Sequence, residues 1–368
     1  MEADPPRSRL QMTSHCDDLT AELRFWSETM GLQLLEIHPA DDPRTAVVEG
    51  HGLRLRLRQG PGPAGPELEL LSDDTRWDAW REAGLTSPGG TRVRIMPLQP
   101  AVEVPQAAQS TVLTRAQGLA HWQIGRAGMR YRDLLPQRHG GAFIASHIRI
   151  VDGGPVPDYV HHHAIRFQLI FCRKGWVRVV YEGQGEPFVM EPGDCVLQPP
   201  HIRHRVLESS AGAEVVEIAS PASHLTQTDP GMSLPGAARL PADHRFGGQR
   251  FVRHRGDEGA WQAWRVPGFA AQDAGIAEAT GGLAGVRVLR PVQGASGSPR
   301  QWHDTELCMY YVLQGSLDVR LDGDRSRLVE DDCLTLAAGQ GYEFAQPSSD
   351  LRLLEVTLPA VFEVRTDA

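Results

Sequence analysis

The sequence predicts a mostly β protein, in which a small α+β domain precedes two similar β-rich units. Three observations support this fold class. Short runs that alternate apolar and polar residues recur along the chain, which favours half-buried strands. A clear helical spacing of apolar residues is found in short segments near the start. From Leu119 onward the chain repeats itself, which predicts two units of about 110 residues each.

Composition narrows the range of functions. The chain has 368 residues, of which 41% are hydrophobic and 23% charged, as in ordinary globular proteins. This length allows two or three domains with substantial cores. The formal charge of -9 argues against nucleic acid or an anionic membrane as a partner, since both require a basic face.

The first residues and the cysteines bear on the compartment. No apolar stretch of signal-peptide or membrane-spanning length is present, so a cytoplasmic protein is expected. The cysteines are odd in number and lack C-x-x-C spacing, which argues against both a disulfide framework and a thiolate zinc site. They are Cys16, Cys172, Cys195, Cys308 and Cys333.

Residues 1–62 predict one small module. Apolar residues at helical spacing from Thr20 to Met30 indicate a helix that begins at a capping threonine and ends before Gly31. Three strands should follow, at residues 33–37, 45–49 and 53–58. This β-α-β-β-β order, with the run FWSETMGLQLLE, resembles a module of the vicinal-oxygen-chelate (glyoxalase and bleomycin-resistance) fold. The resemblance implies a metal site with His and Glu at strand ends, and His15 stands where such a ligand could lie. Because no matching partners are found, a structural or dimerising role is expected.

Residues 63–117 predict a partial second module followed by a linker. A helix is expected at residues 75–83 and a strand at 91–96, after the turn-rich run GPGPAGP. The stretch from Pro97 to Gln109 is rich in Pro, Ala and Gln, which is typical of a linker.

The repeat sets the organisation of the remaining chain. The run that begins at Trp122 parallels the run at Trp264, and Gly175 corresponds to Gly315. EPGDCVLQP corresponds to EDDCLTLAA, so that even two cysteines match. The alignment predicts a first unit at 118–228, a linker at 229–250 and a second unit at 251–368.

Four polar residues in the first copy have the spacing of a metal site. His161 and His163 stand at i and i+2, so an extended segment points both rings to one side. Gln168 offers an amide oxygen, and His204 can approach from another strand. Imidazole nitrogens with one oxygen suit Fe(II), Mn(II), Ni(II), Zn(II) or Cu(II). The alternative is a histidine-rich loop ahead of a core strand.

The segment from Gly154 to His204 resembles the two motifs of the cupin superfamily, whose members are small antiparallel β-barrels. In that family a first motif supplies two His and a Glu or Gln, and a second supplies the last His. The resemblance implies two cupin barrels, one divalent metal ion per chain and a homodimer. It does not specify the reaction.

The second copy has lost most of these donors. Aligned on the shared glycine, His303 stands opposite His163, whereas Gln301 replaces His161 and Tyr342 replaces His204. Cys308 replaces Gln168. The second barrel is therefore predicted to be degenerate, with a structural role.

Three further residues are candidates for catalysis. Arg166 could bind a carboxylate or enolate by a forked contact, or could lie on the surface at the barrel mouth. His147 alternates with apolar residues on a predicted strand, and its polar face could line the barrel interior. His201 precedes His204 by three residues and could contact substrate.

These features lead to three functional hypotheses. Gln168 in place of Glu leaves a bound ion its full charge, which favours anionic chelating substrates. The first hypothesis is an Fe(II) dioxygenase that cleaves a C–C bond of a small enolate, diketone or hydroxy-aromatic substrate. The second is redox-neutral lyase, isomerase or cyclase chemistry with Mn, Ni or Zn. The third is a non-catalytic small-molecule binding protein.

Overall fold

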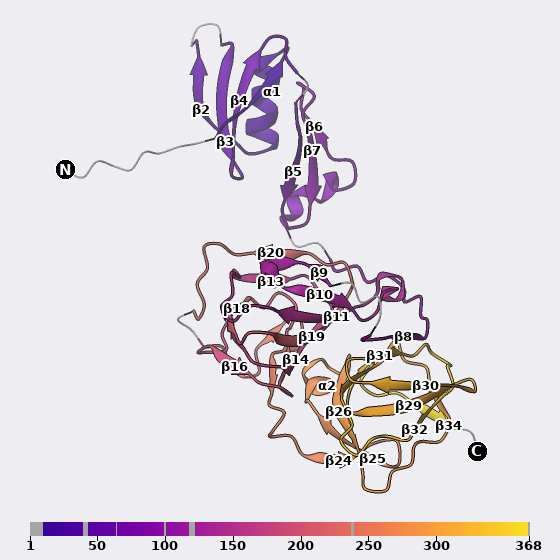
Figure 1. Ribbon diagram of the computed structural model, residues 1–368. Coiled ribbons are helices and arrows are strands. Elements are labelled where there is room, and N and C mark those ends of the chain that lie inside the picture. Colours follow the sequence, from indigo (N-terminus) through magenta and orange to yellow (C-terminus); the bar gives the residue numbers. More distant parts are fainter. Residues whose placement is uncertain are drawn as a thin grey trace, which may run out of the picture. The chain divides into compact units, whose positions relative to one another are not determined.

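The computed structural model describes residues 10–39, 43–63, 65–98, 101–117, 122–236 and 239–366. The chain forms two compact units that divide after residue 101 (Figure 1). The predicted start of the first barrel, residue 118, lies outside the described residues. None of the described helices is long and apolar enough to cross a membrane.

The N-terminal unit begins with a four-stranded sheet of order β1-β4-β3-β2, in which β1 and β4 are parallel. The strands are β1 (Met12–Cys16), β2 (Gln33–His38), β3 (Thr45–Gly50) and β4 (Leu53–Gln59). Helix α1 (Leu19–Arg24) is capped by the Asp18 side chain, which accepts from two backbone N–H groups, and it continues as a π-helix at Phe25–Thr29. The predicted helix and strands are confirmed to within two residues.

A second, three-stranded sheet completes this unit. It consists of β5 (Glu67–Leu71), β6 (Leu85–Thr86) and β7 (Arg92–Met96), with a 3₁₀ helix at Thr75–Trp80. The parallel pair β5–β7 repeats the arrangement of β1–β4. The buried Glu22 carboxylate accepts from Trp26 Nε1 (2.8 Å) and from the backbone N of Gly89 (2.6 Å), and so joins the two halves of the unit. The likeness to a vicinal-oxygen-chelate module stays a prediction.

The remaining chain forms two barrels, each made of two facing sheets (Figure 1). The first barrel has one sheet of β9 (Gln123–Ile124), β10 (Arg130–Asp133), β11 (Ile144–Ile150), β19 (Ala213–Ser220), β14 (Phe167–Lys174), β17 (Cys195–Leu197) and β23 (Val252–His254). Its other sheet has β16 (Phe188–Met190), β15 (Val177–Tyr181), β18 (His204–Ser209), β13 (His161–His163) and β20 (Thr226–Thr228), with β12 (Gly154–Pro155) beside β18.

The second barrel repeats this plan. One sheet holds β24 (Trp261–Ala263), β25 (Phe269–Asp273), β26 (Gly285–Pro291), β33 (Arg352–Leu358), β28 (Leu307–Gln314), β31 (Cys333–Thr335) and β8 (Val112–Thr114). The other holds β30 (Asp324–Val329), β29 (Ser316–Leu321), β32 (Tyr342–Ala345), β27 (Gln301–His303) and β34 (Val364–Thr366). Between the barrels lie the hairpin β21 (Arg245–Phe246) and β22 (Gln249–Arg250), and α2 (Ile276–Ala279) follows β25. His161 pairs with His204 as Gln301 pairs with Tyr342, which confirms the sequence alignment of the copies.

Two short strands cross between the barrels. β8 precedes the first barrel in sequence but pairs with β31 of the second. β23 lies in the stretch assigned to the second barrel, yet it pairs with β17 of the first. The boundary predicted at residue 251 therefore falls just before a strand that belongs to the first barrel's sheet. Each crossing covers a sheet edge of the other barrel.

Strand alternation decides which residues face the site. On β14, Phe167, Leu169 and Phe171 belong to a core shared with the second barrel, because β28 and β33 contribute Met309 and Val356 to the same cluster. The alternate residues of β14 face the interior of the first barrel, where a cavity remains. The interior of the second barrel is instead filled, and its largest side chains are Tyr310, Tyr342, Phe344, Trp264 and Phe269.

Candidate metal centre

Three imidazoles converge inside the first barrel. β13 supplies His161 and His163, and β18 supplies His204. One ring nitrogen of each lies within 4.8 Å of the others, and the ring centroids are 4.2 Å (His161–His204), 5.1 Å (His161–His163) and 5.2 Å (His163–His204) apart. All three side chains are buried. The spacing His-x-His therefore places both rings on one side of the strand, as predicted from the sequence.

Hydrogen bonds at the outer ring nitrogens orient these rings. Nδ1 of His161 donates to the carbonyl of Tyr159 (2.8 Å), and Nδ1 of His204 donates to that of Ile202 (2.9 Å). Nδ1 of His163 is hydrogen bonded with Oγ1 of Thr226 (2.9 Å). The two bonds to carbonyls fix the tautomers of His161 and His204 and leave their Nε2 atoms as electron-pair donors. The Nε2 atom of His161 is buried without a hydrogen-bond partner among the described residues.

Burial keeps the three rings neutral. Removal from water, together with a smaller contribution from the neighbouring His161 ring, lowers the pKa of His163 to about 2. The pKa of His204 falls well below its ordinary value for the same reasons, burial first. Burial also lowers the pKa of His161, and the charge of Arg126 adds to the effect. Neutral imidazole is the form that binds a metal ion.

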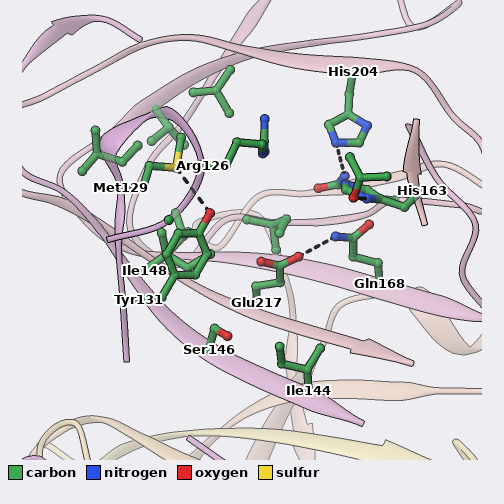
Figure 2. Close-up of a pocket in the computed structure, with 18 of the residues that line it drawn as sticks. Arg126, Met129, Tyr131, Ile144, Ser146, Ile148, His163, Gln168, His204 and Glu217 are labelled. Atoms are coloured by element: carbon green, nitrogen blue, oxygen red, sulfur yellow. Dashed lines mark hydrogen bonds between the residues drawn. The ribbon is translucent and has the colours of Figure 1, made fainter. Parts of the chain in front are cut away.

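Gln168 adds an oxygen donor to the same cavity (Figure 2). Its Nε2 donates to a carboxylate oxygen of Glu217 at 2.5 Å. Its Oε1 is buried and has no hydrogen-bond partner in the part of the chain that the structure describes. Three neutral ring nitrogens and one unpartnered amide oxygen fit a borderline divalent cation.

One contact competes with this set. Gln198, which also lines the cavity, donates its Nε2 to Nε2 of His204 at 2.8 Å. The amide of Gln198 would have to release that nitrogen before His204 could bind a cation.

The cavity around these residues has a volume of about 510 Å³, within the range of small-molecule sites. Much of its wall is apolar and comes from strands of both sheets: Ile144, Ile148, Ile150, Ile170, Val177, Val179, Val206 and Val215. Polar groups stand among them, of which Arg126, Tyr131 and Glu217 carry the clearest chemistry (Figure 2). The cavity can therefore hold a small molecule with an apolar body and a few polar groups.

Arg126 brings a positive charge to the wall. Its guanidinium forms an ion pair with Asp158, whose side chain is fully buried. The other carboxylate oxygen of Asp158 accepts from the backbone N of Val206 (2.9 Å), which fixes its position. Asp158 Oδ1 also lies 3.8 Å from Nδ1 of His161. A single buried carboxylate thus orients the arginine and faces the outer side of a metal-ligand candidate.

Tyr131 is a hydrogen-bond donor at neutral pH. Burial raises the pKa of its hydroxyl to about 12, and the negative charge of Glu217 contributes to the rise. In Figure 2 the ring lies between Met129 and Glu217. A protonated phenol and a carboxylate therefore share the cavity.

Two of the predicted catalytic residues contact the second barrel and do not line the cavity. Arg166 forms a forked ion pair with Glu306, at 2.7 and 3.0 Å, so its carboxylate partner belongs to the chain itself. His147 lies on the face of β11 that carries Arg149, whereas Ile148 and Ile150 line the cavity. The polar face of this strand thus looks outward from the barrel, the reverse of the expectation.

His147 instead joins a buried polar network between the barrels. Its Nε2 donates to Glu214 (2.9 Å), and its Nδ1 accepts from Arg132 (3.1 Å). Tyr311 of the second barrel lies 3.3 Å from the same Nδ1 and donates to Asp331 (2.6 Å). His147, Glu214 and Asp331 are close enough to hold a metal, but their donor atoms are already bonded within the network.

His201 also lies away from the cavity. Its backbone, at a φ of 65°, donates from N to the carbonyl of His163 (3.0 Å). Its ring is 5.6 Å from that of His162, which strand alternation turns away from the metal-ligand candidates. This residue supports the turn before β18 from outside.

Sequence reasoning missed Arg126, Tyr131, Gln198 and Glu217. They lie on segments far apart in the sequence, and only the strand pairing brings them to one cavity. A signal was available for Glu217, because a charged residue in the apolar strand AEVVEIAS requires a buried partner. No comparable pattern marks Gln198.

Comparison with known proteins supports the cupin superfamily. A family model described as "Cupin domain" matches residues 288–357, which lie in the second barrel. No curated protein sequence matches the chain. Most of the similarity to known proteins is therefore found by comparing structures.

Several solved structures have a similar fold. Salicylate 1,2-dioxygenase from Pseudoaminobacter salicylatoxidans, in its adduct with gentisate, is 15% identical, with 72% of this chain and 87% of that one covered and a TM-score of 0.54. Protein Ylba from E. coli is 12% identical, with 78% and 98% covered and a TM-score of 0.51. An oxalate decarboxylase from Bacillus subtilis is 13% identical, with 67% and 77% covered and a TM-score of 0.50. These likenesses show a mostly β, cupin-type barrel fold, as predicted.

Proposed function

We propose that this protein is a metal-dependent cupin enzyme, and that it is an Fe(II) dioxygenase which cleaves a C–C bond of a small chelating substrate. The ion would be held by His161, His163, His204 and the amide oxygen of Gln168. One observation carries the metal assignment: Nε2 of His161 and Oε1 of Gln168 are both buried and lack partners among the described residues. A buried polar atom normally has a hydrogen-bond partner in the protein, an ordered water or a bound ion.

The substrate class follows from the cavity wall. When bound, Fe(II) would supply the redox chemistry that activation of O₂ requires. The guanidinium of Arg126 can bind an anionic group of the substrate, since it pairs with Asp158 through Nη1 and its other N–H groups are available to donate. Tyr131 can donate a hydrogen bond to a second oxygen. The aliphatic wall would pack against the substrate body and exclude water. A hydroxy-aromatic acid satisfies all of these contacts, and salicylate dioxygenase, crystallised with gentisate, shares the fold.

Oxygen consumption tests the proposed reaction. Fe(II)-loaded protein is mixed with salicylate, gentisate or a β-diketone in an oxygen electrode, and products are identified by mass spectrometry. We expect substrate-dependent O₂ uptake, with both oxygen atoms found in a ring-opened or chain-cleaved product. His163→Ala, which lacks one ligand, is the matched control. Turnover under argon with no O₂ uptake would exclude the dioxygenase.

Glu217 favours a second candidate, redox-neutral proton-transfer chemistry with Mn, Ni or Zn. Its carboxylate lies in the cavity and pairs through one oxygen with Gln168, so it can exchange a proton with a bound substrate. A lyase or isomerase would turn over in the absence of O₂, so the same experiment under argon separates the two reactions. A non-catalytic binding protein would show neither O₂ uptake nor turnover under argon. Its function would not require a carboxylate and a phenol beside the metal-ligand candidates.

A further inference from the structure

We propose that Glu217 is a positioning residue for Gln168: its carboxylate holds the amide so that Oε1, and not the NH₂ group, is presented to the metal centre. This inference rests on the proposed metal site. It concerns a residue outside the four candidate ligands.

Strand pairing places the two side chains side by side. β14 and β19 are antiparallel neighbours in which Gln168 stands opposite Ala219 and Ile170 opposite Glu217. Residues 168 and 217 therefore lie diagonally across the pair, on the face that looks into the barrel. Figure 2 shows the carboxylate and the amide facing each other, with the oxygen of Gln168 on the side away from Glu217.

The contact with Glu217 determines the orientation of the Gln168 amide. An amide has a donor end and an acceptor end, whereas an ionised carboxylate only accepts. Glu217 can therefore pair with the NH₂ end at 2.5 Å, and the opposite end, Oε1, is left unpartnered and buried. A rotated amide would set its oxygen against the carboxylate and turn NH₂, which cannot bind a cation, toward the imidazoles. The contact thus selects the only orientation in which Gln168 can serve as a ligand.

The same contact accounts for an amide at position 168. A carboxylate there would stand within hydrogen-bond distance of a second carboxylate, with no proton between them unless one is taken up. Glu217 therefore favours Gln over Glu at this ligand position.

Cobalt binding by the full-length chain tests the inference without reference to turnover. Co(II) is titrated into metal-free protein and followed by its visible spectrum, which reports the ligand set, with affinity taken from chelator competition. Glu217→Leu removes the acceptor, and we expect affinity to fall about 10- to 100-fold, as for other partners of metal ligands, with a changed spectrum. Glu217→Gln keeps an acceptor but allows both amide orientations, so a loss of about twofold is expected.

Ser146→Ala is the control, since Ser146 stands opposite Glu217 on β11 and lines the same cavity. Its affinity and spectrum should match those of the parent. An unchanged affinity and spectrum in Glu217→Leu would overturn the positioning role while leaving the metal site intact. A parent protein that binds no Co(II) would overturn the metal site itself. If Glu217→Leu does not fold, Glu217→Asp withdraws the acceptor by one methylene, and unchanged binding there would equally overturn the proposal.

Discussion

Replacing Gln168 with Glu should destabilise the metal-free protein in a strongly pH-dependent way. The amide now donates to the Glu217 carboxylate at 2.5 Å. The substitution exchanges that donor for a second carboxylate of nearly the same size in a buried position. Both charges then face each other, unless one carboxyl group takes up a proton.

The magnitude follows from two limits. Two unit charges about 4 Å apart repel by about 4 kcal/mol at an effective dielectric of about 20. Alternatively, one carboxyl group with an ordinary pKa of about 4.3 is protonated, which costs about 5 kcal/mol at pH 8 and about 1 kcal/mol at pH 5. The smaller cost applies, so the loss should be about 4 kcal/mol at pH 8 and about 1 kcal/mol at pH 5. The pKa of a carboxyl group in this pair is higher in the folded than in the unfolded protein, so the free energy of unfolding falls as pH rises.

Urea unfolding of the metal-free protein at both pH values measures this loss. Adding Glu217→Gln to Gln168→Glu restores an amide–carboxylate pair with the roles exchanged, so the double variant should regain most of the lost stability at pH 8. In a double-mutant cycle the two changes should couple by about 4 kcal/mol. Additive effects, or a loss for Gln168→Glu that is equal at pH 5 and pH 8, would refute the assigned contact.

Other predictions concern the rings, the competing amide and the arginine. The unfolded chain takes up a proton on His163 below about pH 6.5 that the folded chain excludes, so stability should fall with acidification by about 2 kcal/mol at pH 5 from this ring alone. Urea unfolding should therefore show that the free energy of unfolding falls about 2 kcal/mol less between pH 7 and pH 5 in His163→Asn than in the parent protein. An equal fall in both proteins would contradict burial of a neutral ring at position 163. Gln198→Leu removes the donor that occupies His204, so Co(II) affinity should rise by about 2- to 10-fold, the worth of one hydrogen bond. Weaker binding would mean that Gln198 supports the site. Arg126→Met should weaken binding of salicylate to the metal-loaded protein at least tenfold, as measured by calorimetry, but leave binding of phenol nearly unchanged. An equal loss of affinity for salicylate and phenol would indicate that the substitution distorts the cavity wall instead of removing a charge contact.

The sequence was sufficient for the features that depend on local spacing. The His-x-His pattern and the shared glycines Gly175 and Gly315 identified the converging imidazoles and the alignment of the two barrels, because period-two alternation and turn positions can be read from one strand at a time. In the second copy, Tyr342 stands where the first copy has His204. There Tyr342 and other aromatic side chains fill the interior.

The sequence was insufficient where the surroundings of a strand determine which of its faces lines the cavity. For β11 the pattern showed one polar and one apolar face, but both faces are buried, one against the cavity and one against the second barrel. His147, on the polar face, forms hydrogen bonds at the interface between the barrels. Arg166 pairs with Glu306 of the second barrel. Likewise, the partnership of Gln168 with Glu217 depends on the register of β14 with β19, which no local pattern fixes.

Metal content tests the central claim most directly. The protein is stripped with a chelator, loaded with Fe(II) or Co(II), passed through a desalting column and analysed by inductively coupled plasma mass spectrometry. The parent chain should retain one ion, whereas His161→Ala and His204→Ala should retain almost none while their circular dichroism stays unchanged. A parent chain that retains no ion, or variants that retain as much as the parent, would contradict the account.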